Sequence, residues 1–181
     1  MVPREIKISL PPPKVGYLIK EVYTMAELKM LQLSSEEAHQ FALLAWGQIY
    51  ANSLQALVDK LGSEEALRLL HPYLERVGES APAMAQMMGI TGNDATAIAS
   101  LIHLFDEQVL LVEGKPTEVS TERVVKEITK CPFQDFAPEF CLALLSANQG
   151  MVKAMNPEYT FMMPKFIPNG DPICQWILEK K

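Results

Sequence analysis

The pattern of apolar and polar positions divides the chain into a helical first part and a sheet-forming second part. From Tyr17 to Leu33, apolar side chains recur every three or four residues, which is typical of a helix with one buried face. Ser34-Ser35-Glu36-Glu37 is a capping box, and the helix that it starts is predicted to reach Leu61 and to end at Gly62. Residues 1–16 carry a triple proline and are predicted to form an extended arm.

Two further helical stretches are predicted before residue 107. Ser63 should cap the first, which Pro72 should end or kink before the apolar pattern resumes. Thr91 or Asn93 should cap the second, which is expected from Asp94 to about Phe105. The first part of the chain is therefore predicted to be a layer of helices.

The apolar period changes after Glu107. Val109–Val112 is a short branched run that is predicted to be a strand ending in a turn at Gly114-Lys115-Pro116. Arg123–Thr129 interleaves Val and Ile with charges, as in a strand with one wet face. The two runs predict an antiparallel pair, and Pro138 suits the first turn of a helix that continues to about Met155.

The chain closes with two β-rich runs, Tyr159–Ile167 and Pro172–Leu178, separated by Asn169-Gly170. This dipeptide favours a two-residue hairpin turn, because both of its residues tolerate a positive φ. Such a turn sets the register of the two strands. It places Lys165 opposite Cys174, Met163 opposite Trp176, and Phe161 opposite Leu178.

Helices followed by a β-β-α-β-β order predict an α+β fold, with an N-terminal helical layer packed on a four-stranded antiparallel sheet. We expect residues 17–181 to form a single domain, with its helical part in 17–107 and its sheet-containing part in 108–181. The arm, residues 1–16, precedes it.

Composition and charge narrow the class of protein. The 181 residues are 49% hydrophobic and 21% charged, as in a globular domain, and the net charge is −6. Lys and Arg form no cluster, which argues against nucleic acid and anionic membranes as partners. The N-terminus is charged and broken by proline, unlike a signal peptide, and the longest apolar run, Phe41–Trp46, is too short to cross a bilayer. A cytoplasmic location is expected.

The last third of the chain contains all three cysteines, Cys131, Cys141 and Cys174. Three thiolates would suit Zn²⁺ or another soft metal. Alternatively, Cys141 lies close to a predicted helix start, which would lower its pKa and make it a nucleophile. No Cys-x-x-Cys is present, so burial as small apolar side chains is the third interpretation.

Two further residues are candidates for acid–base chemistry. Asp135 is close to the cysteines in sequence and would serve as a general base, or simply cap the next helix. His103 is followed by Asp106, which would orient it as a base or a metal ligand. Glu139 and Asp171 are also near the cysteines, although a helix start and a turn account for both.

An adaptable apolar pocket is also predicted, because the chain is rich in methionine. It would lie between the Met84–Met88 helix and one face of the last hairpin. Its expected ligand-binding residues are Met84, Met88, Phe161, Met163 and Trp176. The exposed edges of a short sheet and the proline arm would allow a homodimer.

Several motifs occur together in the order found in one known family. They are Arg76-Val77-Gly78, Gly89–Asp94, Thr129–Phe133 with its Cys-Pro-Phe, the helical Cys141, Asn156-Pro157, and Gly170-Asp171-Pro172-Ile173-Cys174. The arrangement resembles the L-2-amino-thiazoline-4-carboxylic acid hydrolase-like family across residues 60–181. The last motif is similar to the hairpin that ends 4-vinyl-reductase-like small-molecule-binding domains.

The resemblance implies a small-molecule pocket, and a hydrolase that opens a C=N or sulfur-containing heterocycle. The alternative function is a non-catalytic sensor that binds a ligand or a metal and acts through a partner. These two functions place different demands on the cysteines, since catalysis needs a reactive thiol or an open metal position.

Overall fold

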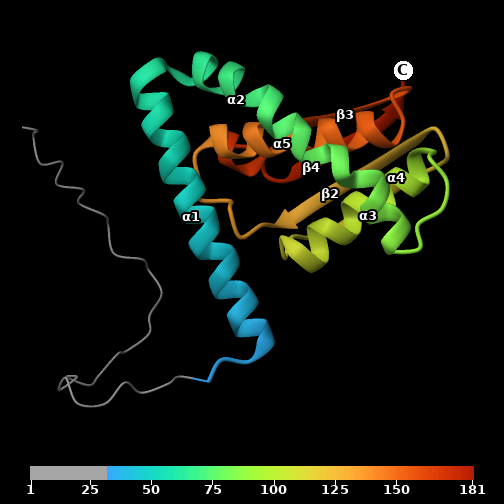
Figure 1. Cartoon of the computed structure of the whole chain (residues 1–181), viewed down its shortest axis with the longest axis horizontal. Helices are drawn as coiled ribbons and strands as arrows, with labels where there is room; N and C mark the ends of the chain where they lie inside the picture. The colour runs from blue at the N-terminus through green and yellow to red at the C-terminus, as the bar shows by residue number, and fades with distance from the viewer. Residues whose placement is uncertain (1–31) are drawn as a thin grey trace, which may run out of the picture. The chain divides into compact units, whose positions relative to one another are not determined.

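Both predicted parts, the helical layer and the sheet, are present in residues 32–181, the range that the computed structural model describes (Figure 1). Ser34–Lys181 form one unit. The predicted arm and the predicted Tyr17–Leu33 helix lie outside the described residues, apart from Gln32 and Leu33, which are not helical. Within the described range, no helix combines the length and the apolar content needed to span a bilayer.

Helix α1 (Ser35–Leu61) begins and ends where the sequence predicts. The Ser34 hydroxyl accepts a hydrogen bond from the Glu37 backbone N–H, and the Glu37 carboxylate accepts one from the Ser34 N–H. At the other end, the N–H of Gly62 donates to the Val58 carbonyl, with a φ of +84° at the glycine. Local sequence therefore sets both ends of this helix.

Helix α2 (Ser63–Val77) corrects two predictions. Ser63 does not cap it, because Gly62 occupies that position and the Ser63 hydroxyl donates to the Glu139 carboxylate instead. Pro72 does not end the helix, which continues for five more residues to Val77. Packing of α2 against the last helix of the unit supports the turn in which Pro72 lacks its backbone hydrogen bond.

Helix α4 (Ala95–Leu104) follows the short helix α3 (Ala81–Met87). Its cap is Asp94, whose carboxylate accepts the Ala97 N–H at 2.9 Å, so neither Thr91 nor Asn93 has the predicted role. Seven of its ten residues are apolar, and six of these are buried. It is therefore the central helix of the larger hydrophobic core.

The predicted strand at Val109–Val112 is wrong. Helix α4 continues into a π-helical turn (Phe105–Val109), and strand β1 (Glu113–Val119) begins four residues later than predicted. Gly114-Lys115-Pro116 thus lies in the strand and not in a turn. Proline is tolerated there because β1 is an edge strand, which need not donate every backbone N–H to a neighbour.

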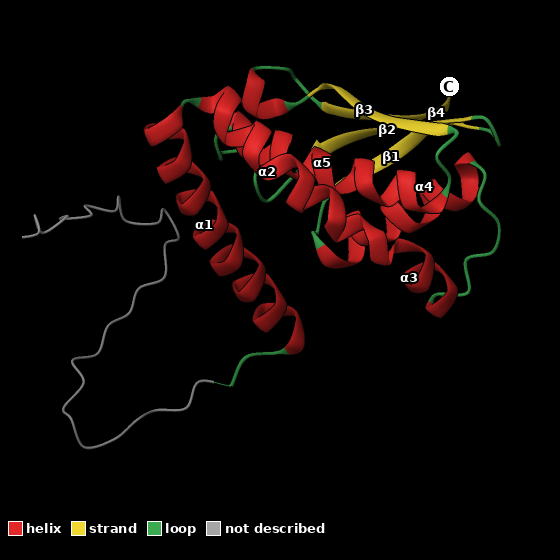
Figure 2. Ribbon diagram, turned by 45° about the horizontal axis from the view of Figure 1, so that its top comes forward, coloured by secondary structure: helices red, strands yellow, loops and turns green. Residues whose placement is uncertain are grey.

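The α+β class and the four-stranded antiparallel sheet are confirmed. Strands β1, β2 (Arg123–Lys130), β4 (Cys174–Lys180) and β3 (Tyr159–Lys165) are adjacent in that order, and helix α5 (Pro138–Met155) connects β2 to β3. Figure 2 shows the helices gathered on one side of the sheet. The face toward them is buried, and its residues are Val124, Lys126, Ile128, Phe161, Cys174, Trp176 and Leu178.

The register of the last hairpin is partly as predicted. Phe161 lies opposite Leu178, but Lys165 lies opposite Gln175 and not Cys174, because the register shifts between Met162 and Lys165. Asn169-Gly170 is not a two-residue turn. A 3₁₀ turn (Ile167–Asn169) ends at Gly170 with φ +95°. Because the connection is longer than a two-residue turn, it does not fix the register that was predicted for Met163 and Lys165.

Helices α2 and α5 approach each other at two glycines. A Cβ atom at Gly150 of α5 would lie 1.9 Å from the carbonyl oxygen of Glu75. A Cβ atom at Gly78, just after α2, would lie 2.1 Å from the backbone nitrogen of Met151. Both contacts are with backbone atoms, so a side chain at either position requires the helices to separate.

We predict that Gly150→Ala lowers the free energy of unfolding by about 1–3 kcal/mol through overpacking. In an uncrowded helix the same change would stabilise by about 1 kcal/mol, so the sign of the effect is diagnostic. Chemical unfolding should be compared with Ser146→Ala in the same helix, which should change the value by less than about 0.5 kcal/mol. A more stable Gly150→Ala protein would contradict the close contact.

Candidate functional site

The fold gathers the three cysteines near one another. Cys131 follows β2, Cys141 lies in the first turns of α5, and Cys174 begins β4. Cys131 packs against both hydrophobic clusters of the unit, so it lies where they meet. Each sulfur is free of disulfide bonds. The Cys131 and Cys174 sulfurs accept backbone N–H groups of Phe133 and Ile167, respectively.

Burial keeps these thiols protonated. It raises the pKa of Cys131 to about 11, and the nearby Cys174 and Asp106 contribute to the rise. Burial also raises the pKa of Cys141 to about 12, with smaller effects from the other two cysteines. The expectation that the start of α5 lowers the pKa of Cys141 is therefore wrong. Desolvation outweighs any effect of the helix dipole at this position.

Hydrogen bonds do not link the other predicted catalytic residues to the thiols within the described residues. Asp135 is exposed and does not cap α5, whose cap is Ala137. No hydrogen bond or ion pair within residues 32–181 joins Cys141, Asp135 and His103. In the same range, no group of three His, Cys, Asp or Glu side chains is arranged to hold a metal ion. The zinc site at Cys131, Cys141 and Cys174 remains a prediction without geometric support.

The inner face of the sheet contains a buried lysine that the sequence analysis missed. Lys126 is 0% exposed, and its ammonium donates to Asp106 Oδ2 at 3.1 Å. Trp176 lies directly opposite Lys126 on β4, and its indole N–H donates to the same oxygen, also at 3.1 Å. We call these three residues the Asp106 cluster. One carboxylate thus joins two strands to the helical layer.

The π-helical turn positions Asp106. The N–H of Leu110 donates to the Phe105 carbonyl, five residues back, and the N–H of Val112 donates to the Asp106 carbonyl. Such turns in otherwise regular helices are frequent at functional sites. Burial raises the pKa of Asp106, although Lys126 and the Trp176 N–H oppose the rise. The Asp106 carboxylate is therefore held in a buried site where desolvation disfavours its charged form.

His103 lies one helical turn before this cluster but is not oriented as predicted. Its Nε2 atom is 3.4 Å from the Glu107 carboxylate, whereas Asp106 is engaged by Lys126 and Trp176. Its Nδ1 atom is buried and has no hydrogen-bond partner within the described residues. A buried ring nitrogen without a partner is costly, and a bound ligand is one way to satisfy it.

A small pocket opens beside His103 and Trp176, between α4 and the strands β1, β2 and β4. Its volume is about 110 Å³, and apolar atoms make up nearly all of its surface. We call it the His103 pocket. Its lining residues are Thr96, Ala99, Ser100, His103, Pro116, Val119, Val124 and Trp176.

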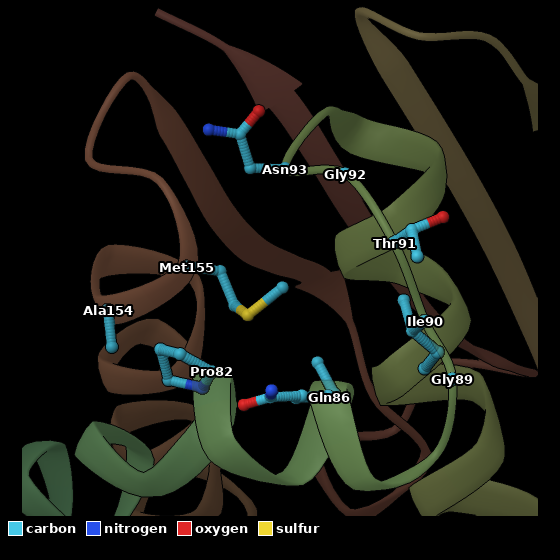
Figure 3. A pocket seen from close by; sticks show the side chains of 10 residues that line it. Pro82, Gln86, Gly89, Ile90, Thr91, Gly92, Asn93, Ala154 and Met155 are labelled. Atoms are coloured by element: carbon cyan, nitrogen blue, oxygen red, sulfur yellow. The ribbon is translucent and has the colours of Figure 1, made fainter.

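A second, larger pocket of about 280 Å³ lies among α3, the loop after it and the end of α5 (Figure 3). In Figure 3 the Met155 side chain lies between Gln86 and Pro82 of α3 on one side and Asn93 on the other. The Asn93 carbonyl accepts a hydrogen bond from the Asn156 side chain, which ties the loop to the end of α5. The polar groups of this pocket are side-chain amides and a hydroxyl, and none is ionisable.

The predicted ligand-binding residues are divided between core and surface. Phe161 and Trp176 are buried with ring centroids 5.6 Å apart, and Met84 and Met163 pack against the same core. Met88 is 44% exposed. Of the five, only Trp176 lines either pocket described here. The remaining four stay predictions.

Lys126 could have been found from the sequence. In Val124–Ile128, alternate positions face the helices, so a strand with Val124 and Ile128 inside must also place Lys126 inside. An inward lysine in a sheet needs a buried counter-ion. His103 and Asp106 are candidates from the sequence alone, but their actual partners, Glu107 for His103 and Lys126 with Trp176 for Asp106, are not the predicted ones.

We predict that Lys126→Met lowers the free energy of unfolding by about 3 kcal/mol near neutral pH, because it leaves a buried carboxylate without its cation. Lys126→Met combined with Asp106→Asn should recover much of this loss. The Asp106 pKa is already raised and rises further without Lys126, so the folded variant binds a proton more tightly than the unfolded chain does. The free energy of unfolding of the Lys126→Met single variant should therefore fall as pH rises above the ordinary carboxyl pKa of 3.8. Unfolding curves at several pH values test this, and a loss that does not change with pH would contradict it.

We also predict that the native thiols react slowly with iodoacetamide at pH 8. A pKa of about 12, against an ordinary 9.0, leaves Cys141 with about a thousandfold less thiolate. Mass spectrometry of tryptic peptides would give the rate at each cysteine, and the chain unfolded in guanidinium provides the control. Rapid native labelling of Cys141 would restore it as a candidate nucleophile.

Comparisons with known proteins identify the fold. No protein-family model and no curated protein matches the sequence. Trafficking protein particle complex subunit 3 from Naegleria fowleri, in a structure covalently bound to palmitic acid, is similar with a TM-score of 0.60 and 12% identity over 81% of this chain and 97% of that one. The phenol-responsive sensory domain of the transcription activator PoxR, solved with phenol, has a TM-score of 0.56 and 16% identity over 85% of this chain and 78% of that one. The chain therefore shares the α+β fold of these two proteins.

Proposed function

We propose that this unit is a small-molecule-binding domain whose ligand is a compact aromatic molecule bearing one hydrogen-bonding group, held in the His103 pocket. The observation that carries the proposal is the combination of an apolar pocket with a buried His103 Nδ1 that has no partner within the described residues. Apolar walls with one or two placed polar groups are the usual composition of a ligand site.

The size of the pocket limits the ligand. A dry apolar cavity of about 150 Å³ in another protein holds benzene, so a pocket of about 110 Å³ admits at most a single ring. The indole of Trp176 supplies an aromatic face, and its N–H is already used by Asp106. A ligand hydroxyl would therefore pair with His103, which can donate or accept at Nδ1 according to its tautomer.

The two similar structures are consistent with this proposal, but they are not the evidence for it. One neighbour is a phenol-responsive sensory domain and the other holds a fatty acid, so the shared fold accommodates apolar ligands of different lengths. At 12% and 16% identity the likeness extends to the fold alone. The ligand class proposed for this chain therefore rests on its own pocket.

A cysteine-dependent hydrolase is the second candidate. It is favoured by the resemblance to the thiazoline hydrolase-like family and by the gathering of the three thiols. The raised pKa values of Cys131 and Cys141 disfavour it, because a protonated thiol is a weak nucleophile. Non-catalytic binding needs no reactive thiol, so it accounts for more of the observed features.

We predict that phenol raises the melting temperature of the full chain in a concentration-dependent manner, because it binds the folded state alone. Ser100→Leu should narrow the His103 pocket and abolish the rise. His103→Phe should weaken phenol binding about 2- to 10-fold, the value of one hydrogen bond, and leave toluene binding unchanged. Calorimetric titration would give both affinities.

Gln86→Leu, in the larger pocket of Figure 3, is the matched control and should leave phenol binding unchanged. Loss of binding in Gln86→Leu but not in Ser100→Leu would move the site to the larger pocket. No thermal response to phenol or toluene at any concentration would contradict the proposed ligand class.

A further inference from the structure

Helix α1 presents apolar side chains on a face that the rest of the unit does not cover. Figures 1 and 2 both show its N-terminal half extending beyond the other elements. Phe41 and Trp46 are each 70% exposed, and Ile49 is 55% exposed. We call this face the outer stripe of α1. Its residues are Ala38, Phe41, Ala42, Ala45, Trp46 and Ile49, all exposed and spaced to share one side of the helix.

The opposite side of α1 already has its partners. Gly47 and Leu54 are buried, and a Cβ atom at Gly47 would lie 2.8 Å from the Phe133 ring. Tyr50 stacks edge-on against Phe140 with centroids 5.4 Å apart. The helix is therefore apolar on two faces, whereas a helix that borders a single domain needs only one.

The outer stripe is confined to the first half of the helix. Beyond Ile49 the same side carries Asn52, Ser53 and Lys60, all exposed and polar. At 1.5 Å per residue, the segment from Ala38 to Ile49 is about 17 Å long. The outer stripe thus ends at Ile49, although Leu57 and Leu61 are also exposed farther along the helix.

We propose that the outer stripe of α1 is the contact surface for a second copy of this chain. The stripe can be self-complementary, because it combines the large side chains of Phe41, Trp46 and Ile49 with the small Ala38, Ala42 and Ala45. In a two-fold arrangement, the large residues of one helix pack over the alanines of the other. Identical patches that fit each other are what a two-fold interface requires.

Charge also favours a second copy. No Asp, Glu, Lys or Arg occurs between Glu37 and Asp59, although the chain as a whole has a net charge of −6. Two acidic copies meet more favourably where their contact surfaces carry no like charge. An uncharged stripe satisfies this condition and offers nothing to a strongly acidic or basic partner.

The area is sufficient for a modest interface. A buried aromatic side chain contributes about 150–250 Å², so Phe41 and Trp46 with their neighbours would bury on the order of 500 Å² per copy. The total of about 1,000 Å² lies at the lower limit for a specific interface. We therefore expect a dimer that dissociates on dilution.

Sedimentation equilibrium of the full chain tests the proposal over a range of concentrations. The mass should rise from 20.2 kDa toward twice that value. Ala42→Glu and Trp46→Glu should each keep the protein monomeric, with circular dichroism and melting temperature close to those of the diluted wild type. Asn52→Glu, on the polar half of the same side, is the matched control and should still dimerise.

Trp46 provides a second readout, because the other tryptophan, Trp176, is only 2% exposed. Its fluorescence should shift to the red as the dimer dissociates, and this shift should be absent in Trp46→Phe. A wild-type protein that stays monomeric at all concentrations would overturn the proposal. Dimers that persist in both Ala42→Glu and Trp46→Glu would also overturn it.

Discussion

The buried ion pair between Lys126 and Asp106 is the constraint on which the arrangement of helices and sheet depends. A lysine at the centre of the inner face has no access to water, so the helical layer must supply an anion at that point. The turn after α4 places Asp106 there, and the same carboxylate oxygen also accepts the Trp176 N–H. Such a pair adds little net stability, but it fixes how the two layers align.

The two hydrophobic clusters are joined by small and adaptable groups. Gly78 and Gly150 allow backbone contact between the segments around α2 and α5, and Cys131 packs against both clusters. A thiol in this position is a compact apolar side chain with a polarizable atom. The raised pKa values of Cys131 and Cys141 are consequences of that packing. Proximity of cysteines in this fold therefore follows from core formation and does not by itself indicate chemistry.

Sequence reasoning succeeded where a local interaction decides the structure. The Ser34–Glu37 capping box, Gly62 and Pro138 each act within one helical turn, and each set a helix end as predicted. It failed where a distant partner decides. Val109–Val112 has the composition of a strand, but Lys126 and Trp176 hold Asp106 in a π-helical turn that continues to Val109. The pocket at His103 depends on which neighbours His103 and Asp106 take, and a single sequence does not contain that information.

The His103 pocket and α1 are connected through the same turn of chain. His39, on the inner side of α1, hydrogen-bonds to the Val109 carbonyl at 3.0 Å, and Val109 ends the π-helical turn that contains Asp106. His103 itself contacts this turn, because its Nε2 atom lies 3.4 Å from the Glu107 carboxylate, and α1 holds the end of the turn at Val109. If ligand binding favours one position of this turn, association through the outer stripe of α1 must change ligand affinity by the same factor as the ligand changes association. Phe105–Val109 is thus the segment through which the two proposed interactions of this domain would be coupled.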